Sequence, residues 1–357
     1  MRKWKMKVAQ LAGLALGAGL ALALITLSGC QNNFVKESAF KRSGDNSASG
    51  KGRKNISLVT WNLQTFFDAE TTGTEYKEFK NSERWTKEKY RKRLEKLCEV
   101  MTTLNPDIFV MEEIENAGVV QDIANLLAGG SWENKKSWQY ACFAKESGAA
   151  IGCAVFSRYE LSNLRTHSLD IRTQNEDQPS SRPLLQVSVN AGGQELELFV
   201  NHWKSKSGGE EETEIWRDWQ ELVLAGRINA VQTENPDQPV LICGDFNRSA
   251  EDFVLQPKEK NANTILRGSA GQEALYSPWF RPDGKFAFET GSYYYRGEWE
   301  RIDNIMIGGK AELTSFSTVT DPPLADEEGL PASYALYTGE GCSDHLPLKC
   351  LISIIPR

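Results

Sequence analysis

The sequence predicts a single α/β domain, and three features of the chain support this prediction. The segment Pro239–Asn247 (PVLICGDFN) contains a short apolar run that ends at a glycine, as is typical of a buried central strand. Between Tyr90 and Leu104, apolar residues recur at helical spacing with Lys, Arg and Glu between them, which indicates an amphipathic helix lying on a sheet. Strand-like and helix-like segments intermix along the rest of the chain, without an internal repeat or a Gly-rich phosphate loop.

The other predicted elements lie between Ile56 and Ile355. Two further helices are expected, at Gly118–Leu127 and Glu211–Val231, and the second begins with acidic residues, which suits the helix dipole. Residues 249–285 form a polar segment to which no element is assigned. The remaining strands are expected at Ile56–Trp61, Asp107–Met111, Trp138–Phe143, Ala150–Ser157, Pro183–Val189, Glu195–Val200, Ile302–Ile307 and Leu346–Ile355.

Composition places the chain among ordinary globular proteins and limits how it can meet a polyanion. It has 357 residues, of which 40% are hydrophobic and 25% charged, and its formal net charge is −7. Without the first 29 residues, 37 Lys and Arg stand against 48 Asp and Glu, which gives −11. This balance excludes a broad basic surface for nucleic acid, so a polyanionic substrate would have to be met by a metal ion or a few placed cations.

The N-terminus has the pattern of an export signal. Met1–Lys7 is basic, Val8–Leu27 is apolar, and small residues precede Cys30. The Leu-Ser-Gly-Cys ending resembles the lipobox of bacterial lipoproteins, which implies cleavage before Cys30 and lipidation of that residue. An uncleaved membrane anchor is the alternative, because about twenty apolar residues can span a bilayer. Both alternatives place the folded part outside the cytoplasm, facing the periplasm or at the cell surface.

Residues 30–54 are rich in Ser, Asn, Gly and Lys and are expected to form a flexible tether. The predicted organisation is therefore a signal peptide over 1–29, a tether over 30–54 and a folded domain over 55–357. A disulfide between Cys342 and Cys350 is one open alternative for the cysteines.

Polar side chains follow several of the predicted strands. Because ligands of open α/β sheets lie at the carboxyl ends of strands, we expect these side chains to converge on one pocket. Carboxylate and amide oxygens are ligands for a hard cation such as Mg²⁺, which polarises phosphoryl groups, and a histidine beside them can move a proton near neutral pH. The side chains are Asn62, Glu113, His202, Asp245, Asn247, Asp303, Asp344 and His345.

The motifs that carry these residues resemble those of a known superfamily. TWN, MEEI, NHWKS, GDFN, RIDN and SDHLP occur in this order between Ile56 and Ile355. They are similar to the endonuclease/exonuclease/phosphatase superfamily, which includes deoxyribonucleases, abasic-site endonucleases, sphingomyelinases and inositol polyphosphate phosphatases. The resemblance implies a four-layered α/β sandwich, deoxyribonuclease-like, in which two mixed β-sheets pack face to face with helices outside.

The resemblance also implies a role for each residue. Asn62, Glu113 and Asp344 would be ligands of Mg²⁺, with Mn²⁺ or Ca²⁺ as alternatives. Asp245 and Asn247 would orient the attacking water and hold the scissile phosphate. His345, oriented by Asp303, would be the general base or a phosphate-stabilising imidazolium, and the resemblance does not decide whether it or Asp245 takes the water's proton. His202 would be a second catalytic histidine that assists the leaving group.

Two departures from the family pattern and three open assignments remain. Gln64 stands where some members carry a charge, and no Glu before Cys153 matches the partner that deoxyribonucleases give to the middle histidine. Arg182 and Lys204 are candidates for substrate phosphate contacts, with solvated surface cations as the alternative. The aromatic run Tyr293–Tyr295 is expected to pack in the core, and base stacking is the alternative.

The leading hypothesis from the sequence is an exported, metal-dependent phosphodiesterase that acts as a nuclease on DNA or RNA. A sphingomyelinase or inositol-phosphate phosphatase is the alternative within the enzymes, and a surface binding lipoprotein without catalysis is the alternative outside them. The lipid on Cys30 would attach the protein to a membrane. No protein partner is implied, and a monomer is expected.

Overall fold

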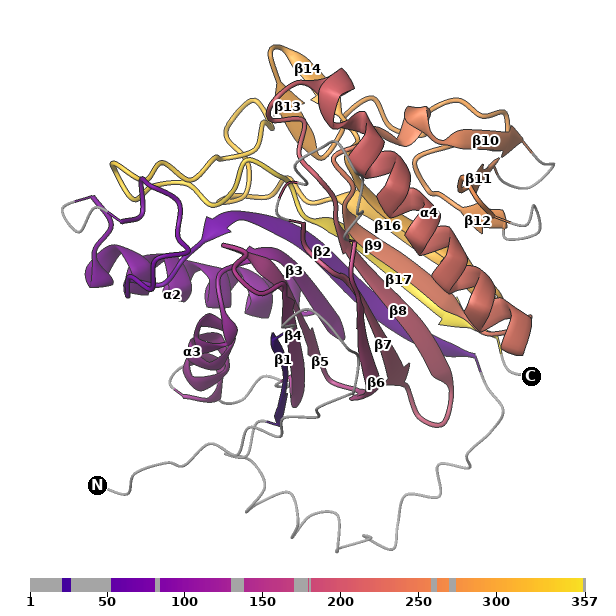
Figure 1. Cartoon of the computed structure of the whole chain (residues 1–357), viewed down its shortest axis with the longest axis horizontal. Coiled ribbons are helices and arrows are strands. Elements are labelled where there is room, and N and C mark those ends of the chain that lie inside the picture. The colour runs from indigo at the N-terminus through magenta and orange to yellow at the C-terminus, as the bar shows by residue number, and fades with distance from the viewer. Residues whose placement is uncertain are drawn as a thin grey trace, which may run out of the picture.

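The structure is a computed structural model that describes residues 21–26, 53–80, 84–129, 138–169, 179, 181–257, 262–269 and 274–355. Two large sheets and three helices make up most of these residues (Figure 1). The predicted lipidation site Cys30 and most of the tether lie outside the described residues.

The first sheet has seven strands in the order β1-β4-β5-β3-β2-β17-β16. Strand β2 runs parallel to β3 and antiparallel to β17, so the sheet is mixed. Its edge strand β1 falls within the predicted signal peptide and pairs with β4, so cleavage before Cys30 would leave β4 as the edge. The strands span Ala21–Thr26 (β1), Lys54–Phe66 (β2), Ile108–Ile114 (β3), Tyr140–Lys145 (β4), Gly152–Ser157 (β5), Ala311–Thr318 (β16) and Leu348–Ile354 (β17).

The second sheet has eight strands in the order β10-β11-β12-β15-β9-β8-β7-β6. Strand β9, the predicted central strand, is buried along its whole length and lies parallel to β8 and antiparallel to β15. Two short strands form a separate hairpin, Tyr293–Tyr295 (β13) with Glu298–Glu300 (β14). The eight strands span Glu160–His167 (β6), Leu184–Asn190 (β7), Glu195–His202 (β8), Val240–Asp245 (β9), Val254–Pro257 (β10), Ala262–Ile265 (β11), Ala274–Tyr276 (β12) and Asp303–Gly308 (β15).

Three apolar clusters show the order of the layers. The largest joins side chains of both sheets, such as Leu58 and Val110 from the first with Val187 and Leu241 from the second, so the sheets pack face to face. A second cluster lies between the first sheet and helices α2 (Lys87–Leu104) and α3 (Ala117–Ala128). A third lies between the second sheet and α4 (Glu210–Glu234), which Figure 1 shows along that sheet's outer face. The predicted four-layered α/β sandwich is confirmed.

The helix ends follow from local sequence. The side chain of Thr86 accepts a hydrogen bond from the amide of Lys89 and caps α2, and Asn116 caps α3 in the same way through Val119. Helix α4 has no side-chain cap, but its first turn carries Glu210, Glu211 and Glu212, whose charges favour the positive end of the helix dipole.

The structure contains strands that were not predicted, among them the eight-residue edge strands β6 and β16. The polar segment 249–285 contains a 3₁₀ turn (Ala250–Asp252) and strands β10, β11 and β12, which are too short and polar to give a sequence signal. The cysteines Cys342 and Cys350 are free rather than bonded. Within the part of the chain that the structure describes, no helix has the length and apolar character needed to cross a membrane.

Candidate active site

Three neighbouring strands of the second sheet bring three of the predicted site residues together. In the strand register, Asp245 at the end of β9 lies opposite His202 on β8 and Asp303 on β15. A glycine is required at Gly244, because a Cβ there would lie 2.0 Å from the carbonyl oxygen of Asn201 on the adjacent strand. The close approach of β8 and β9 therefore depends on this glycine and sets His202 beside Asp245.

Asn62 connects the ends of the two sheets. Its amide nitrogen Nδ2 lies 3.0 Å from Asp245 Oδ2, on the second sheet, and 3.3 Å from Glu113 Oε1, on the first. The hydroxyl of Ser343 donates to the backbone oxygen of Asn62 at 2.6 Å, which brings the following Asp344 and His345 to the same place. Residues from six separate segments thus converge, as the sequence predicts.

His345 forms a buried pair with Asp303. Nδ1 of the imidazole lies 2.7 Å from Asp303 Oδ2, and both side chains are buried. The carbonyl oxygen of His345 accepts a hydrogen bond from the indole of Trp61 at 2.8 Å, and the ring of Tyr293 lies 4.7 Å from the imidazole. The contact with Asp303 fixes the orientation of the ring and leaves Nε2 on the side of Asp344, whose Oδ1 lies 4.0 Å away.

Among the residues that the structure describes, His202 has no single carboxylate partner of the deoxyribonuclease kind. Its Nε2 lies 3.0 Å from Arg182 Nη2, 3.5 Å from Glu113 Oε1 and 3.7 Å from Asp245 Oδ2. Because a guanidinium can only donate, Nε2 accepts in the contact with Arg182. The partner that the sequence left unassigned is therefore Arg182, with two carboxylates close by.

The loop after β9 is shaped around Asp245. The amide and side chain of Asn247 both donate to this carboxylate, at 2.7 and 2.9 Å, and the side chain also donates to the carbonyl oxygen of Trp203. Asn247 has φ 46° and Glu113 has φ 66°, a left-handed conformation that is uncommon for residues with a side chain. Strained backbone of this kind is concentrated at functional sites.

The electrostatics of the site separate its titrating groups. Burial and the nearby charge of Asp303 raise the pKa of Asp245 to about 7. Burial lowers the pKa of His345, but the charge and hydrogen bond of Asp303 outweigh it, so the pKa lies well above its ordinary value. Burial, with the charges of Arg182 and His345, holds the pKa of His202 well below the usual range. Near neutral pH the imidazole of His345 is therefore charged, that of His202 is neutral, and the carboxyl group of Asp245 is near the midpoint of its titration.

The residues present fit a hard divalent cation in part. No group of three His, Cys, Asp or Glu side chains able to hold a metal occurs among the residues that the structure describes. Burial and the neighbouring Asp344 raise the pKa of Glu113, so these two carboxylates act on each other, and Mg²⁺ takes one or two carboxylates with waters. Asn62 turns its nitrogen toward the carboxylates while its oxygen accepts from the amide of Gln64, so its role as a ligand stays a prediction.

Residues 57–320 match the family model described as the Endonuclease/Exonuclease/phosphatase family. The chain belongs to this family. Its members hydrolyse phosphoric esters, and the convergence of carboxylate, amide and imidazole groups described above suits that chemistry. A comparison with curated proteins finds no match.

Solved structures similar to this member of the family share its fold. A truncated TDP2 from Caenorhabditis elegans has 15% identity and TM-score 0.53, and the match covers 84% of this chain and 97% of that one. A D. rerio TDP2 complexed with a single-strand DNA product has 16% identity, TM-score 0.52, and coverage of 84% and 99%. A mannosyl-6-phosphatase from Bacteroides thetaiotaomicron has 15% identity, TM-score 0.51, and coverage of 83% and 99%. At these identities the likeness shows the fold alone.

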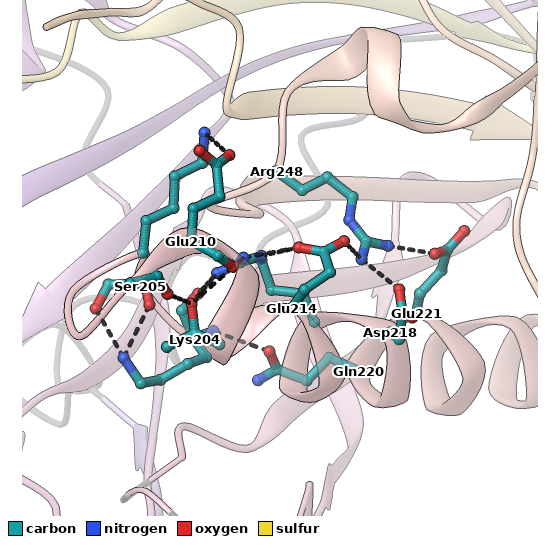
Figure 2. Close-up of polar contacts among 12 residues, drawn as sticks. Lys204, Ser205, Glu210, Glu214, Asp218, Gln220, Glu221 and Arg248 are labelled. Atoms are coloured by element: carbon teal, nitrogen blue, oxygen red, sulfur yellow. Dashed lines mark hydrogen bonds and ion pairs between the residues drawn. The ribbon is translucent and has the colours of Figure 1, made fainter.

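Lys204, a predicted phosphate contact in this endonuclease/exonuclease/phosphatase chain, is turned toward its own loop. Its ammonium donates to the carbonyl oxygens of Ser205 and Ser207, and Figure 2 shows it directed at Ser205. Helix α4 holds the same loop, because Gln220 accepts from the amide of Lys204 and Arg217 donates to its carbonyl. Its contact with phosphate stays a prediction, whereas Arg182 lies in the site.

Three residues near the site have contacts that the sequence did not predict. Arg248, directly after Asn247, is buried and pairs with three acidic residues of α4 (Figure 2). Glu112 is fully buried, accepts from the hydroxyl of Thr60, and has a pKa raised well above its usual value by burial. Tyr293 packs on His345 rather than in the core. The contacts of each residue join segments that are distant in the sequence. The only local signal was the charge of Arg248 directly after the GDFN motif.

Proposed function

We propose that this protein is a metal-dependent nuclease that cleaves phosphodiester bonds of DNA or RNA. The observation that carries the proposal is the meeting of Asp245, His202 and the His345–Asp303 pair at the ends of adjacent strands, with Glu113 and Asn62 facing them from the other sheet. A carboxylate near the midpoint of its titration can activate water, and a charged imidazole next to it can neutralise charge on the attacked phosphate.

Asp245 is the group suited to take the proton of the attacking water. Its pKa of about 7 leaves much of it ionised at neutral pH while it remains basic enough to accept a proton. His345 is kept protonated by Asp303 and is therefore suited to hold a non-bridging phosphate oxygen through Nε2. Asn247, bonded to Asp245 through both its amide groups, fixes the direction of the base.

Arg182 and His202 form the side of the site where we place the phosphate and the leaving group. Burial, together with the charge of the guanidinium, holds the pKa of His202 well below its usual range, so the imidazole is neutral in the absence of substrate. Arg182 has no ion pair with an acidic residue among the described contacts, and a bidentate contact with phosphate suits its geometry. Binding of a phosphate anion by Arg182 would weaken its effect on His202 and favour protonation of that histidine beside the leaving oxygen.

Glu113 and Asp344 are the residues that would hold a divalent cation, Mg²⁺ first among the candidates. When bound, such an ion polarises the phosphoryl group and stabilises charge on it. The side chain of Asp344 is about one-third exposed and that of Glu113 less so, which leaves room for the waters that Mg²⁺ retains.

Two observations favour a second substrate class. The acidic balance of the chain does not favour a long polyanion, and one similar structure is a mannosyl-6-phosphatase. Hydrolysis of a small phosphate ester, such as an inositol or sugar phosphate, or of sphingomyelin, is therefore the alternative.

An activity assay separates these functions. We would supply the protein with Mg²⁺ and offer single-stranded DNA, duplex DNA, RNA, sphingomyelin, inositol phosphates and a sugar 6-phosphate. Cleavage of nucleic acid that is lost in EDTA and in His345→Ala supports the proposal, with His167→Ala on β6 as a matched histidine control. Release of phosphate or choline phosphate alone supports the alternative, and turnover of nothing contradicts both.

We further propose that the enzyme is an extracytoplasmic lipoprotein anchored through Cys30. The basic, apolar and small-residue pattern before Cys30 supports this. Metabolic labelling with a radioactive fatty acid tests it: the wild type takes up label and Cys30→Ser does not. Equal labelling of both chains contradicts the proposal.

A further inference from the structure

The β13–β14 hairpin lies beside the active site and is fixed there by several contacts. Tyr293 pairs with His345 through an isolated β-bridge, and the amide of Leu346 donates to the carbonyl oxygen of Ser292 at 2.7 Å. On the opposite side, Lys206 forms an ion pair with Glu300 at 2.9 Å and ties the hairpin to the loop after β8. Figure 1 places the hairpin near the start of α4, apart from both large sheets. Its side chains are therefore held in position before substrate arrives.

One face of this hairpin carries a row of rings that begins at the catalytic histidine. The ring of Tyr293 lies 4.7 Å from that of His345, and the ring of Tyr295 lies 6.1 Å from that of Tyr293 at an interplanar angle of 18°. Tyr294 points to the other face, where it packs against Trp299. The expectation that this aromatic run lies in the core is wrong, because it forms a two-stranded hairpin whose outermost tyrosine is 47% exposed.

We propose that Tyr293 and Tyr295 form a stacking platform for a nucleobase next to the scissile phosphate. The inference rests on the proposed nuclease function and names the part of the substrate that this face of the site takes. Stacking is sequence-tolerant, since every base has a flat π-face, and tyrosine rings are used in this way by proteins that bind single strands. The rings of Tyr293 and Tyr295 are near-parallel, whereas the His345 ring is tilted by 35° from that of Tyr293, so the stack that a flat aromatic partner would extend is that of the two tyrosines.

The charges around the platform indicate which part of a nucleotide lies there. Glu300 pairs with Tyr293 across the hairpin, and Glu298 pairs with Tyr295, so carboxylates border the rings. Lys206 balances the charge of Glu300, whereas the charge of Glu298 beside Tyr295 disfavours a phosphate there and favours an uncharged group, from whose N–H the carboxylate can accept a hydrogen bond. The guanidinium of Arg296 lies over the ring of Tyr295, 5.0 Å from its centroid, so an incoming base would displace it from the ring and leave the cation to meet the next phosphate of the strand. The active site and Arg296 thus bracket a place for one base.

The platform is tested with two single-stranded substrates of equal length, oligo(dT) and a chain of abasic tetrahydrofuran residues. Tyr295→Ala should raise KM for oligo(dT) about tenfold, the size expected for one lost base–aromatic stack, with kcat unchanged. Tyr295→Trp should restore the wild-type KM. The abasic chain should show the same KM with the wild type and with Tyr295→Ala. Tyr337→Ala, an exposed tyrosine outside the hairpin, serves as the matched control.

A binding measurement separates failure of the platform from failure of the nuclease function. Fluorescence anisotropy of labelled oligo(dT) in EDTA reports affinity without turnover. Weaker binding by Tyr295→Ala than by the wild type supports the platform even if no nucleic acid is cleaved. Equal KM and equal affinity overturn it, even if the wild type is an active nuclease. A KM change confined to a sugar phosphate overturns the nucleobase assignment in favour of a carbohydrate. Absence of oligo(dT) binding by the wild type overturns the platform, whereas the nuclease function is decided separately by the cleavage assay with Mg²⁺.

Discussion

Asp303 Oδ2 lies 2.7 Å from Nδ1 of His345, and both side chains are almost completely buried. A carboxylate in this position selects the tautomer of the imidazole and stabilises its charged form, as in other Asp–His pairs. The pair joins β15 of the second sheet to the segment that enters β17 of the first. It can therefore form only when the two sheets pack correctly against each other.

Asp303→Asn should lower kcat while leaving KM for the same substrate nearly unchanged. The amide keeps the shape of the side chain but removes the charge that holds His345 protonated, and losses of about 10²–10⁴-fold accompany removal of a general acid–base group or its orienting partner. Steady-state kinetics on an oligonucleotide would measure this. Asp283→Asn, in an exposed ion pair, should behave as the wild type. Wild-type kcat in Asp303→Asn would contradict the role given to the pair.

Asp245 should make stability depend on pH in a defined direction. Its folded pKa, about 7, is above the ordinary value, so the native state holds a proton that the unfolded chain has lost. Stability in EDTA therefore falls as pH rises from about 4 to about 7 and levels off above, by at most about 1.4 kcal/mol per pH unit from this group. In Asp245→Asn this contribution is absent, so the variant should gain stability relative to the wild type across that window. Urea unfolding at several pH values tests this, and a constant difference between the two proteins would refute it.

Arg182→Ala should lower kcat/KM about 10- to 100-fold, mainly through KM, because a charge-assisted hydrogen bond to phosphate is worth about 1.5–3 kcal/mol. It should also raise the pKa of His202, since the guanidinium is one of the causes that lower it. An NMR titration of the His202 imidazole follows the second effect. Arg91→Ala, an exposed arginine on α2, should change neither quantity. An unchanged His202 titration would show that the two side chains do not interact in solution.

Arg248→Ala should destabilise the protein by about 3–5 kcal/mol, as expected when one partner of a buried ion-pair network is removed. Its guanidinium pairs with Glu221, which is equally buried, with Glu214, and with Asp218 at 2.5 Å. All three acidic residues belong to α4, so the loss also frees the loop that carries Asn247. Urea denaturation gives the size of the effect, and Arg281→Ala, in an exposed pair, should stay within about 0.5 kcal/mol of the wild type. A similarly small change in Arg248→Ala would show that the network is not needed for stability.

How far the sequence predicts this structure depends on the range of the interactions involved. Strand β9 and helix α2 were predictable because an apolar run and a helical period are local signals. The polar strands β10–β12 were not, since they are held by pairing with one another and, through β12, with β15 rather than by their own composition. The site residues were found through short motifs at strand ends, which the sheet register then aligns.

The contacts among those residues could not be predicted in the same way. The pairing of Arg182 with His202 joins a loop before β7 to the end of β8, and no spacing rule connects them. The orientation of the Lys204 ammonium toward its own loop, and that of Tyr293 toward His345, likewise depend on how loops close over the sheet edge. Sequence therefore predicted which groups lie close together, and the fold determines what each one touches.

The central claim is that Asp245 and His345 act as one unit on a phosphorus centre. It is tested most directly by the rate of Mg²⁺-dependent phosphodiester cleavage in the wild type, Asp245→Asn, His345→Ala and the double variant. The account predicts that each single change lowers kcat about 10³-fold or more, that the double variant is scarcely slower than either, and that EDTA abolishes wild-type activity. Single variants with near wild-type rates, or losses that multiply in the double variant, would contradict it.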